Sequence, residues 1–284
     1  MRRSVVWMLA PAILTIGLLF AGGLLLCLRE SVSTADGWTL QHYAALLGDR
    51  EFLAALGLTI AVSLATTVLS AVCGLSLALA LHPVVQRSRS ITVLLQIPIA
   101  VPHLAMALVL INVLAPSGLL ARIAYTAGWI AGPADFPQLL NDGQGLGIIL
   151  AYVLKETPFI ALMVLSTLVR TEREYDDVAR TLGASPWQRL RWVTIPLAAP
   201  ALLSSSVIVL AFVFNAFEIP FLLGRPYPAM LSVVAQRRFA DVDLAQRPGA
   251  MAIALVMLAV TVALAAIYSK VASAVTGAER PSLP

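Results

Sequence analysis

Six polar or ionisable residues lie inside long apolar runs, and they are the residues most able to do chemistry or bind a solute. They are His103, Asn112, Lys155, Glu156, Asn215 and Glu218. An ionisable group in hydrocarbon is costly, so such residues usually face the interior of a helix bundle. They could instead form structural hydrogen bonds between helices, and for Asn215 and Glu218 we favour a place on a solute path.

The spacing of these residues limits which of them can act together. Lys155 and Glu156 are sequence neighbours, about 100° apart around a helix, so they cannot both address one partner on the same face. We therefore expect one of the two to pair with another helix. Asn215 and Glu218 are three residues apart, and a continuous helix would place both on one face in its outer half.

No pattern in the sequence is typical of an enzyme active site, a metal site or a cofactor site. Three histidines are scattered at positions 42, 82 and 103, and we find neither a glycine-rich phosphate loop nor carboxylates with catalytic spacing. Cys27 and Cys73 lie in apolar stretches without metal-ligand spacing, so we interpret them as packing residues. We expect no catalytic residues, no metal and no cofactor.

The composition indicates an integral membrane protein. Hydrophobic residues make up 60% of the 284 residues and charged residues 12%, with a mean hydropathy of +0.89. The net charge of +4 comes from arginines in short loops, which favours contact with lipid headgroups over nucleic acid. The basic start is followed by an apolar run longer than that of a signal peptide, so we interpret it as a retained first span.

The apolar runs predict an all-α fold with one transmembrane domain over residues 1–284. A span needs about 20 mostly apolar residues. This rule predicts six spans, near 5–28, 56–81, 91–114, 145–169, 200–223 and 249–271. Small residues such as Ala71, Gly74 and Ala78 favour close helix packing. Pro98 to Pro102 should break the third span and Pro158 the fourth, although a simple kink is an alternative for any one proline.

The arginines predict an orientation. Five of them lie between residues 170 and 191, and others flank the first, second and last predicted spans. The positive-inside rule therefore places both termini and the segment 172–196 in the cytoplasm, although four arginines in the outer loop 225–247 weaken the contrast. That outer loop could contact a partner protein or form a solvated cap.

The polar segment 172–196 has the local signals of two short helices. Residues 175–182 can form two turns, Gly183 suits a C′ position with positive φ, and Ser185–Pro186 is typical of an N-cap followed by proline at N1. These signals predict a helix pair on the membrane surface. Ala179, Gly183 and Ala184 are small enough to let a partner approach closely. A solvated basic loop that only fixes topology is the alternative.

The same segment resembles the signature of binding-protein-dependent ABC importer permeases: Glu-Ala-Ala, three residues, Gly, nine residues, Ile, one residue, Leu-Pro. The matching residues are Asp177, Val178, Ala179, Gly183, Val193, Ile195 and Pro196. Asp and Val replace the first Glu and Ala, and the spacing is intact. The stretch 214–224 is similar to the branch that includes permeases for spermidine and putrescine, ferric iron, thiamine and sulfate.

The resemblance implies a permease subunit in a bacterial inner membrane that forms a translocation path. It implies three protein partners: a dimer of ABC ATPase subunits, a second permease subunit, identical or homologous, and an extracytoplasmic substrate-binding protein. ATP hydrolysis would belong to the separate ATPase, so the chain itself would not be an enzyme. The residues implied to contact the ATPase are Asp177, Val178, Ala179, Gly183, Ala184, Val193, Ile195 and Pro196.

The substrate is left open among several small solutes. We favour a polyamine-like cation, because Glu156 and Glu218 would offer carboxylates in a low-dielectric path. Lys155 could instead counter an anion, and ferric iron, thiamine and sulfate are alternatives. An ion-coupled secondary transporter or a membrane scaffold would be a different class of protein. The former usually has an internal repeat, and we find no matching halves.

Overall fold

The computed structural model describes residues 2–34, 37–85 and 89–277, and these residues are almost entirely helical. The strands among them are β1 (Ser33–Thr34) and β2 (Gly37–Trp38), which form one antiparallel pair. Six helical stretches among the described residues are long and apolar enough to cross a membrane. The predicted all-α fold with six spans is confirmed.

Twelve α-helices follow one another along the described chain. They are α1 (Arg2–Ser31), α2 (Gln41–Gly48), α3 (Arg50–Val85), α4 (Arg89–Ala100), α5 (His103–Leu114), α6 (Leu119–Thr126), α7 (Leu146–Thr181), α8 (Pro186–Arg189), α9 (Ile195–Asn215), α10 (Glu218–Leu223), α11 (Leu231–Phe239) and α12 (Arg247–Gly277). Short 3₁₀ turns cover Pro133–Asp135 and Leu244–Gln246, and a π-helical turn covers Leu190–Thr194.

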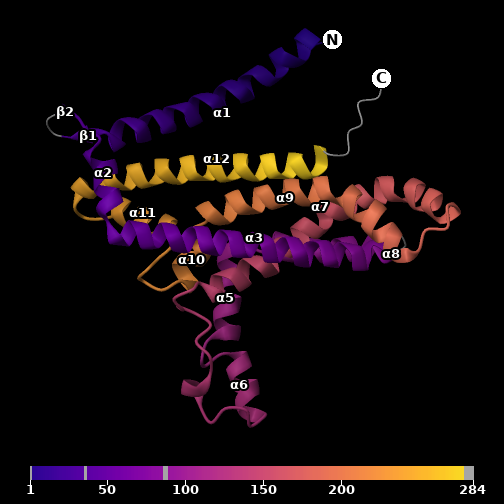
Figure 1. Cartoon of the computed structure of the whole chain (residues 1–284). Helices are drawn as coiled ribbons and strands as arrows, with labels where there is room; N and C mark the ends of the chain where they lie inside the picture. The colour runs from indigo at the N-terminus through magenta and orange to yellow at the C-terminus, as the bar shows by residue number, and fades with distance from the viewer. Residues whose placement is uncertain (1, 35–36, 86–88, 278–284) are drawn as a thin grey trace.

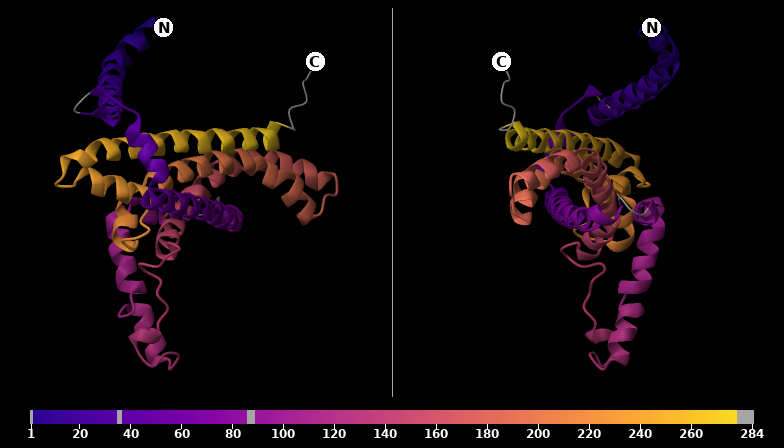
Figure 2. Two further views of the ribbon diagram at one scale, coloured as in Figure 1. Left: turned by 60° about the vertical axis from the view of Figure 1, so that its left-hand side comes forward. Right: turned by 90° about the vertical axis from the view of Figure 1, so that its right-hand side faces the viewer.

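The long helices form a bundle in which α3, α7 and α9 pack against one another and α12 covers α9 (Figure 1). Helix α1 contacts α12 and rises away from the bundle toward its N-terminus (Figure 2). The turn between α7 and α8 and the end of α12 lie toward the same end of the bundle (Figures 1 and 2). Helices α5 and α6 project sideways from the bundle in every view (Figures 1 and 2).

The third predicted span is two helices rather than one. Helix α4 ends at Ala100 and α5 begins at His103, with Pro102 in an extended conformation between them (ψ 144°). The break expected between Pro98 and Pro102 is confirmed, and its cause is local. Pro102 cannot donate a backbone hydrogen bond, and it disfavours the helical conformation at the residue before it. The chain turns here from the bundle into the projecting α5.

The prediction that Pro158 breaks the fourth span is wrong. Helix α7 runs through Pro158 without interruption for 36 residues, from Leu146 to Thr181. Pro158 is buried where α7 packs between α3 and α9. A proline is tolerated inside a membrane helix when neighbouring helices enclose the freed carbonyl. The fifth span is the one that breaks, because Ala216 is extended (ψ 141°) between α9 and α10.

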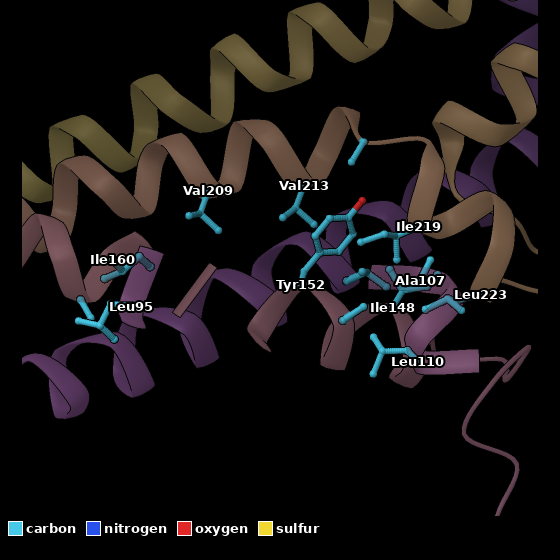
Figure 3. Close-up of a cluster of buried hydrophobic side chains, with 14 of the residues drawn as sticks. Leu95, Ala107, Leu110, Ile148, Tyr152, Ile160, Val209, Val213, Ile219 and Leu223 are labelled. Carbon is cyan, nitrogen blue, oxygen red and sulfur yellow. The ribbon is translucent and has the colours of Figure 1, made fainter. Parts of the chain in front are cut away.

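The core lies between α3, α7 and α9 and includes Tyr152, Ile160, Val209 and Val213 (Figure 3). The predicted close packing by small residues is confirmed at Gly74, where an added Cβ would lie 2.7 Å from Cγ2 of Ile160. Glycine at this position therefore lets α3 approach α7 more closely than any other residue would.

Candidate functional site

A tight turn joins α7 to α8 at one end of the bundle. Gly183 has a φ of +79°, which confirms the predicted C′ position. The N–H of Gly183 donates to the carbonyl of Arg180, and the N–H of Ala184 donates to the carbonyl of Ala179, both at 3.0 Å. These two bonds form a Schellman motif, which satisfies carbonyls at the end of α7. We call residues 172–196 the α7–α8 hairpin.

The start of α8 also follows the sequence prediction. The Ser185 hydroxyl accepts the N–H of Gln188 at 3.4 Å, and the Gln188 side chain accepts the N–H of Ser185 at 2.8 Å. Together with Pro186 at N1 they form a capping box. The predicted helix pair forms, and each of its arms belongs to a longer run of helix. The first arm continues α7, and the second passes through the π-helical turn directly into α9.

Asp176 fastens the two arms of the hairpin together. Its carboxylate accepts hydrogen bonds from Nε of Arg180 at 2.9 Å and from Nη1 of Arg189 at 2.8 Å. Charge-assisted bonds of this kind are stronger than neutral ones. Our sequence reasoning missed Asp176 because the family signature begins at Asp177. The available signal was the opposite charge of Arg180 four residues later on the same helix.

The residues predicted to contact an ATPase have different exposures. Asp177 and Val178 are exposed on α7, whereas Ala179 is buried inside the hairpin, so its small size serves packing within this chain. Gly183 is exposed, and an added Cβ there would meet nothing within 4 Å. Ala184, Val193 and Pro196 are half-buried, and Ile195 is exposed. Ala179 is therefore less accessible to a partner than Gly183, and its contact with an ATPase stays a prediction.

Large apolar side chains that our sequence reasoning missed surround the turn. Leu182 is 81% exposed, Trp187 66% and Trp192 70%, and the guanidinium of Arg191 lies over the Trp192 ring at 5.4 Å. An exposed apolar surface with a polar rim is typical of a protein or membrane contact.

Inside the bundle, Lys155 closes the break between α4 and α5. Its ammonium group donates to the carbonyls of Pro98 at 3.3 Å and Ile99 at 3.4 Å, and also to that of Val101. An ammonium has three donors, so all three are used. The expectation that Lys155 or Glu156 pairs with another helix holds for Lys155. Its partners are carbonyls that the helix break leaves without intrahelical donors.

Glu156 lines a cavity of about 220 Å³ beside this break. The cavity is lined by Ile99, His103, Lys155, Glu156, Phe159, Ile208, Val209 and Phe212. The rings of His103 and Phe212 have centroids 5.0 Å apart, and the Tyr152 ring meets that of Phe212 edge-on at 6.1 Å. Figure 3 shows Tyr152 projecting from α7 toward Val213 and Ile219. Sequence reasoning found the polar residues of this cavity but missed its rings.

Asn215 and Glu218 do not share a helix face, contrary to the prediction. The break at Ala216 separates them, so that Asn215 ends α9 and Glu218 begins α10. The Asn215 side chain donates to the hydroxyl of Thr261 on α12 at 2.9 Å, whereas Glu218 is exposed. Asn215 therefore links α9 to α12, and its place on a solute path stays a prediction. Asn112 likewise donates to a carbonyl of its own helix, that of Leu108, at 2.9 Å.

An ionic cluster at the opposite end of the bundle joins α11 to the start of α3. Arg238 donates to Asp49, and to Glu51 at 3.2 Å. Partial burial acts to raise the pKa of Asp49, but the hydrogen bonds from Arg238 and from backbone N–H groups hold this pKa below its ordinary value. This part of the loop 225–247 therefore packs onto the bundle, while Val242 at its tip is 97% exposed.

Curated relatives of the chain are transport permeases. An inner membrane ABC transporter permease protein of Escherichia coli, YnjC, is 30% identical over 227 residues, which cover 78% of this chain and 41% of that protein. The putrescine permease PotI of Escherichia coli is 24% identical over 89% of this chain and 85% of its own length. The chain thus spans less than half of YnjC but most of PotI.

A solved transporter structure shares the fold of the chain, and a family model matches most of its length. The structure of a bacterial alginate ABC transporter, in complex with alginate pentasaccharide-bound periplasmic protein, matches 96% of each chain with a TM-score of 0.76 and 19% identity, which establishes a shared fold. The model of the family described as "Binding-protein-dependent transport system inner membrane component" matches residues 70–276. The chain therefore belongs to this family of inner membrane transport components.

Proposed function

We propose that the chain is the transmembrane permease subunit of an ATP-driven ABC importer. The family match over residues 70–276, which includes the whole α7–α8 hairpin, is the observation that carries this proposal. In this proposal residues 1–284 form one transmembrane domain, with both termini and the hairpin in the cytoplasm. ATP is hydrolysed by a separate subunit, because the sequence has no phosphate-binding loop.

The α7–α8 hairpin is the proposed contact with the ATPase dimer. Its exposed surface combines Asp177 and Val178 from the family signature with Leu182 and Trp187 at the turn. Both arms continue directly into α7 and α9, so a displacement of the hairpin moves two bundle helices. A second permease subunit and an extracytoplasmic binding protein complete the proposed assembly.

Affinity purification of the tagged chain from its native membranes, followed by mass spectrometry, tests this proposal. We expect an ABC ATPase to copurify with the wild type and to be lost with Gly183→Val, because valine is strained at a φ of +79°. Gly128→Val is the matched control. Gly128 has a φ of +74° and equally open surroundings, but it lies after α6, outside the hairpin.

The two variants separate a specific contact from general damage. Loss of the ATPase in Gly183→Val with retention in Gly128→Val supports the proposed docking surface. Recovery of an ATPase with all three proteins would place the contact elsewhere on the chain. Failure to recover any ATPase with the wild type would contradict the importer assignment itself.

The proposed substrate is a small polar or charged solute, with a polyamine-like cation favoured. Two observations support a cation. All three ammonium donors of Lys155 are engaged by backbone carbonyls, so this residue has no donor left for an anion. Glu156 and Glu218 keep their carboxylates free of hydrogen bonds among the described residues. Ferric iron, thiamine and sulfate are the alternative substrates.

A further inference from the structure

We propose that the cavity beside the α4–α5 break is a binding site for a primary ammonium group, with Glu156 as its counter-charge. The inference rests on the proposed transport function and names the chemical class that this part of the path admits. Four kinds of observation carry it: a buried carboxylate, a lysine whose donors are occupied, an unpartnered imidazole nitrogen, and the size of the cavity.

The Glu156 carboxylate is buried without hydrogen-bond donors. The residue is only 9% exposed and faces the cavity, and among the described residues nothing donates a hydrogen bond to it. A carboxylate has about four acceptor positions, and burying it without donors is costly. An ammonium group in the cavity would supply both the donors and the opposite charge.

The neighbouring Lys155 places a positive charge nearby but donates no hydrogen bond to this carboxylate. Its ammonium group is directed at the carbonyls of Pro98, Ile99 and Val101, which form the end of α4. Its charge is thus spread over backbone dipoles at the cavity wall. The Glu156 carboxylate is thus left without a hydrogen bond from Lys155.

The other walls of the cavity are suited to an organic ammonium. Nε2 of His103 is buried and has no hydrogen-bond partner among the described residues, and a neutral imidazole can present this atom as an acceptor. The rings of Phe159 and Phe212 line the same space. Aromatic faces attract cations that lie within about 6 Å of the ring centroid.

The volume of the cavity limits the ligand. At about 220 Å³ it is much larger than the share of liquid volume that one water occupies, about 30 Å³. It is smaller than the roughly 300–1,000 Å³ of sites that hold drug-sized molecules. The cavity therefore has room for an ammonium group with a few methylenes, and because it is open on one side a longer ligand extends beyond it.

Equilibrium binding of radiolabelled putrescine to the purified complex in detergent tests the proposal. We expect saturable binding to the wild type, weakened about 30-fold or more by Glu156→Gln, since this variant removes one charge of a buried pair. Glu156→Asp keeps the charge and should bind within about tenfold of the wild type. Glu30→Gln, in α1 outside the cavity, is the matched control and should bind normally.

The outcomes distinguish this site from the wider transport proposal. Thermal unfolding of each variant shows whether it is folded. If Glu156→Gln is not folded, the putrescine affinity of Glu156→Asp is compared with that of the wild type instead. Wild-type binding that is absent up to about 10 mM, or unchanged in folded Glu156→Gln, would overturn the site. Equal binding of glucuronate would overturn the charge preference. Glu156-dependent binding without a copurified ATPase would leave the site intact and remove the importer assignment.

Discussion

At the scale of single residues, Lys155 illustrates how a charge is retained inside an apolar bundle. The residue is 4% exposed, yet its charge is not matched by a hydrogen-bonded carboxylate. Its partners are instead carbonyls at the end of α4. The lysine and the helix break therefore depend on each other: the break supplies acceptors for the charge, and the charge supplies donors for the break.

Replacing Lys155 by methionine should destabilise the protein by about 2–4 kcal/mol. The apolar side chain leaves the carbonyls at the break without donors and leaves Glu156 without a nearby positive charge. The expected result is a lower Tm of the purified protein in detergent. Lys155→Arg keeps the charge and the donors, and it should recover most of the difference. Equal Tm values for methionine and wild type would show that the carbonyls find other donors.

The sequence predicted which residues matter better than it predicted their partners. Glu156 and Lys155 were identified because ionisable groups in apolar runs are rare and costly. The partners of Lys155 could not be predicted, because they are backbone carbonyls more than 50 residues away that become available only where α4 ends. Asp176 was missed for a related reason, since its bond to Arg189 forms only when the hairpin closes.

At the scale of elements, hydropathy predicted the helices but not which prolines interrupt them. Pro102 breaks a helix and Pro158 does not, although both lie in apolar runs. The difference is tertiary, because Pro158 is enclosed where α7 packs between α3 and α9. The break at Ala216 had no proline signal at that residue, and our prediction of a shared face for Asn215 and Glu218 failed there.

Alanine at two glycines of α3 should have effects of opposite sign. Gly74→Ala places a Cβ 2.7 Å from Ile160 and should destabilise the protein by about 1–3 kcal/mol. Gly57→Ala meets nothing within 4 Å and should stabilise α3 by up to about 1 kcal/mol, because alanine loses less backbone entropy. Tm values of the two purified variants provide the measurement. A similar shift for both would mean that α3 and α7 can separate without cost.

At the scale of the whole molecule, the predicted membrane orientation can be tested at the two ends of the helix bundle. The hairpin turn and the tip of the loop between α11 and α12 lie at opposite ends of the bundle (Figure 1). In a background of Cys27→Ser and Cys73→Ser, we expect a membrane-impermeant maleimide on spheroplasts to label Val242→Cys but not Thr181→Cys. Both positions are exposed, so accessibility alone does not separate them. The reverse labelling pattern would invert the orientation derived from the arginines.

Helix α7 has a mechanical consequence for the entire assembly. It is one continuous helix of 36 residues, about 54 Å long, with Glu156 in its first third and Asp176 near its C-terminal end. The sequence separation of 20 between these residues corresponds to about 30 Å along the helix. A rotation of the hairpin is therefore transmitted along one helix to the cavity wall, and Pro158, which interrupts the hydrogen bonds of α7 beside Glu156, is the position where that helix can bend. The α7–α8 hairpin and the Glu156 cavity are thus connected through one helix.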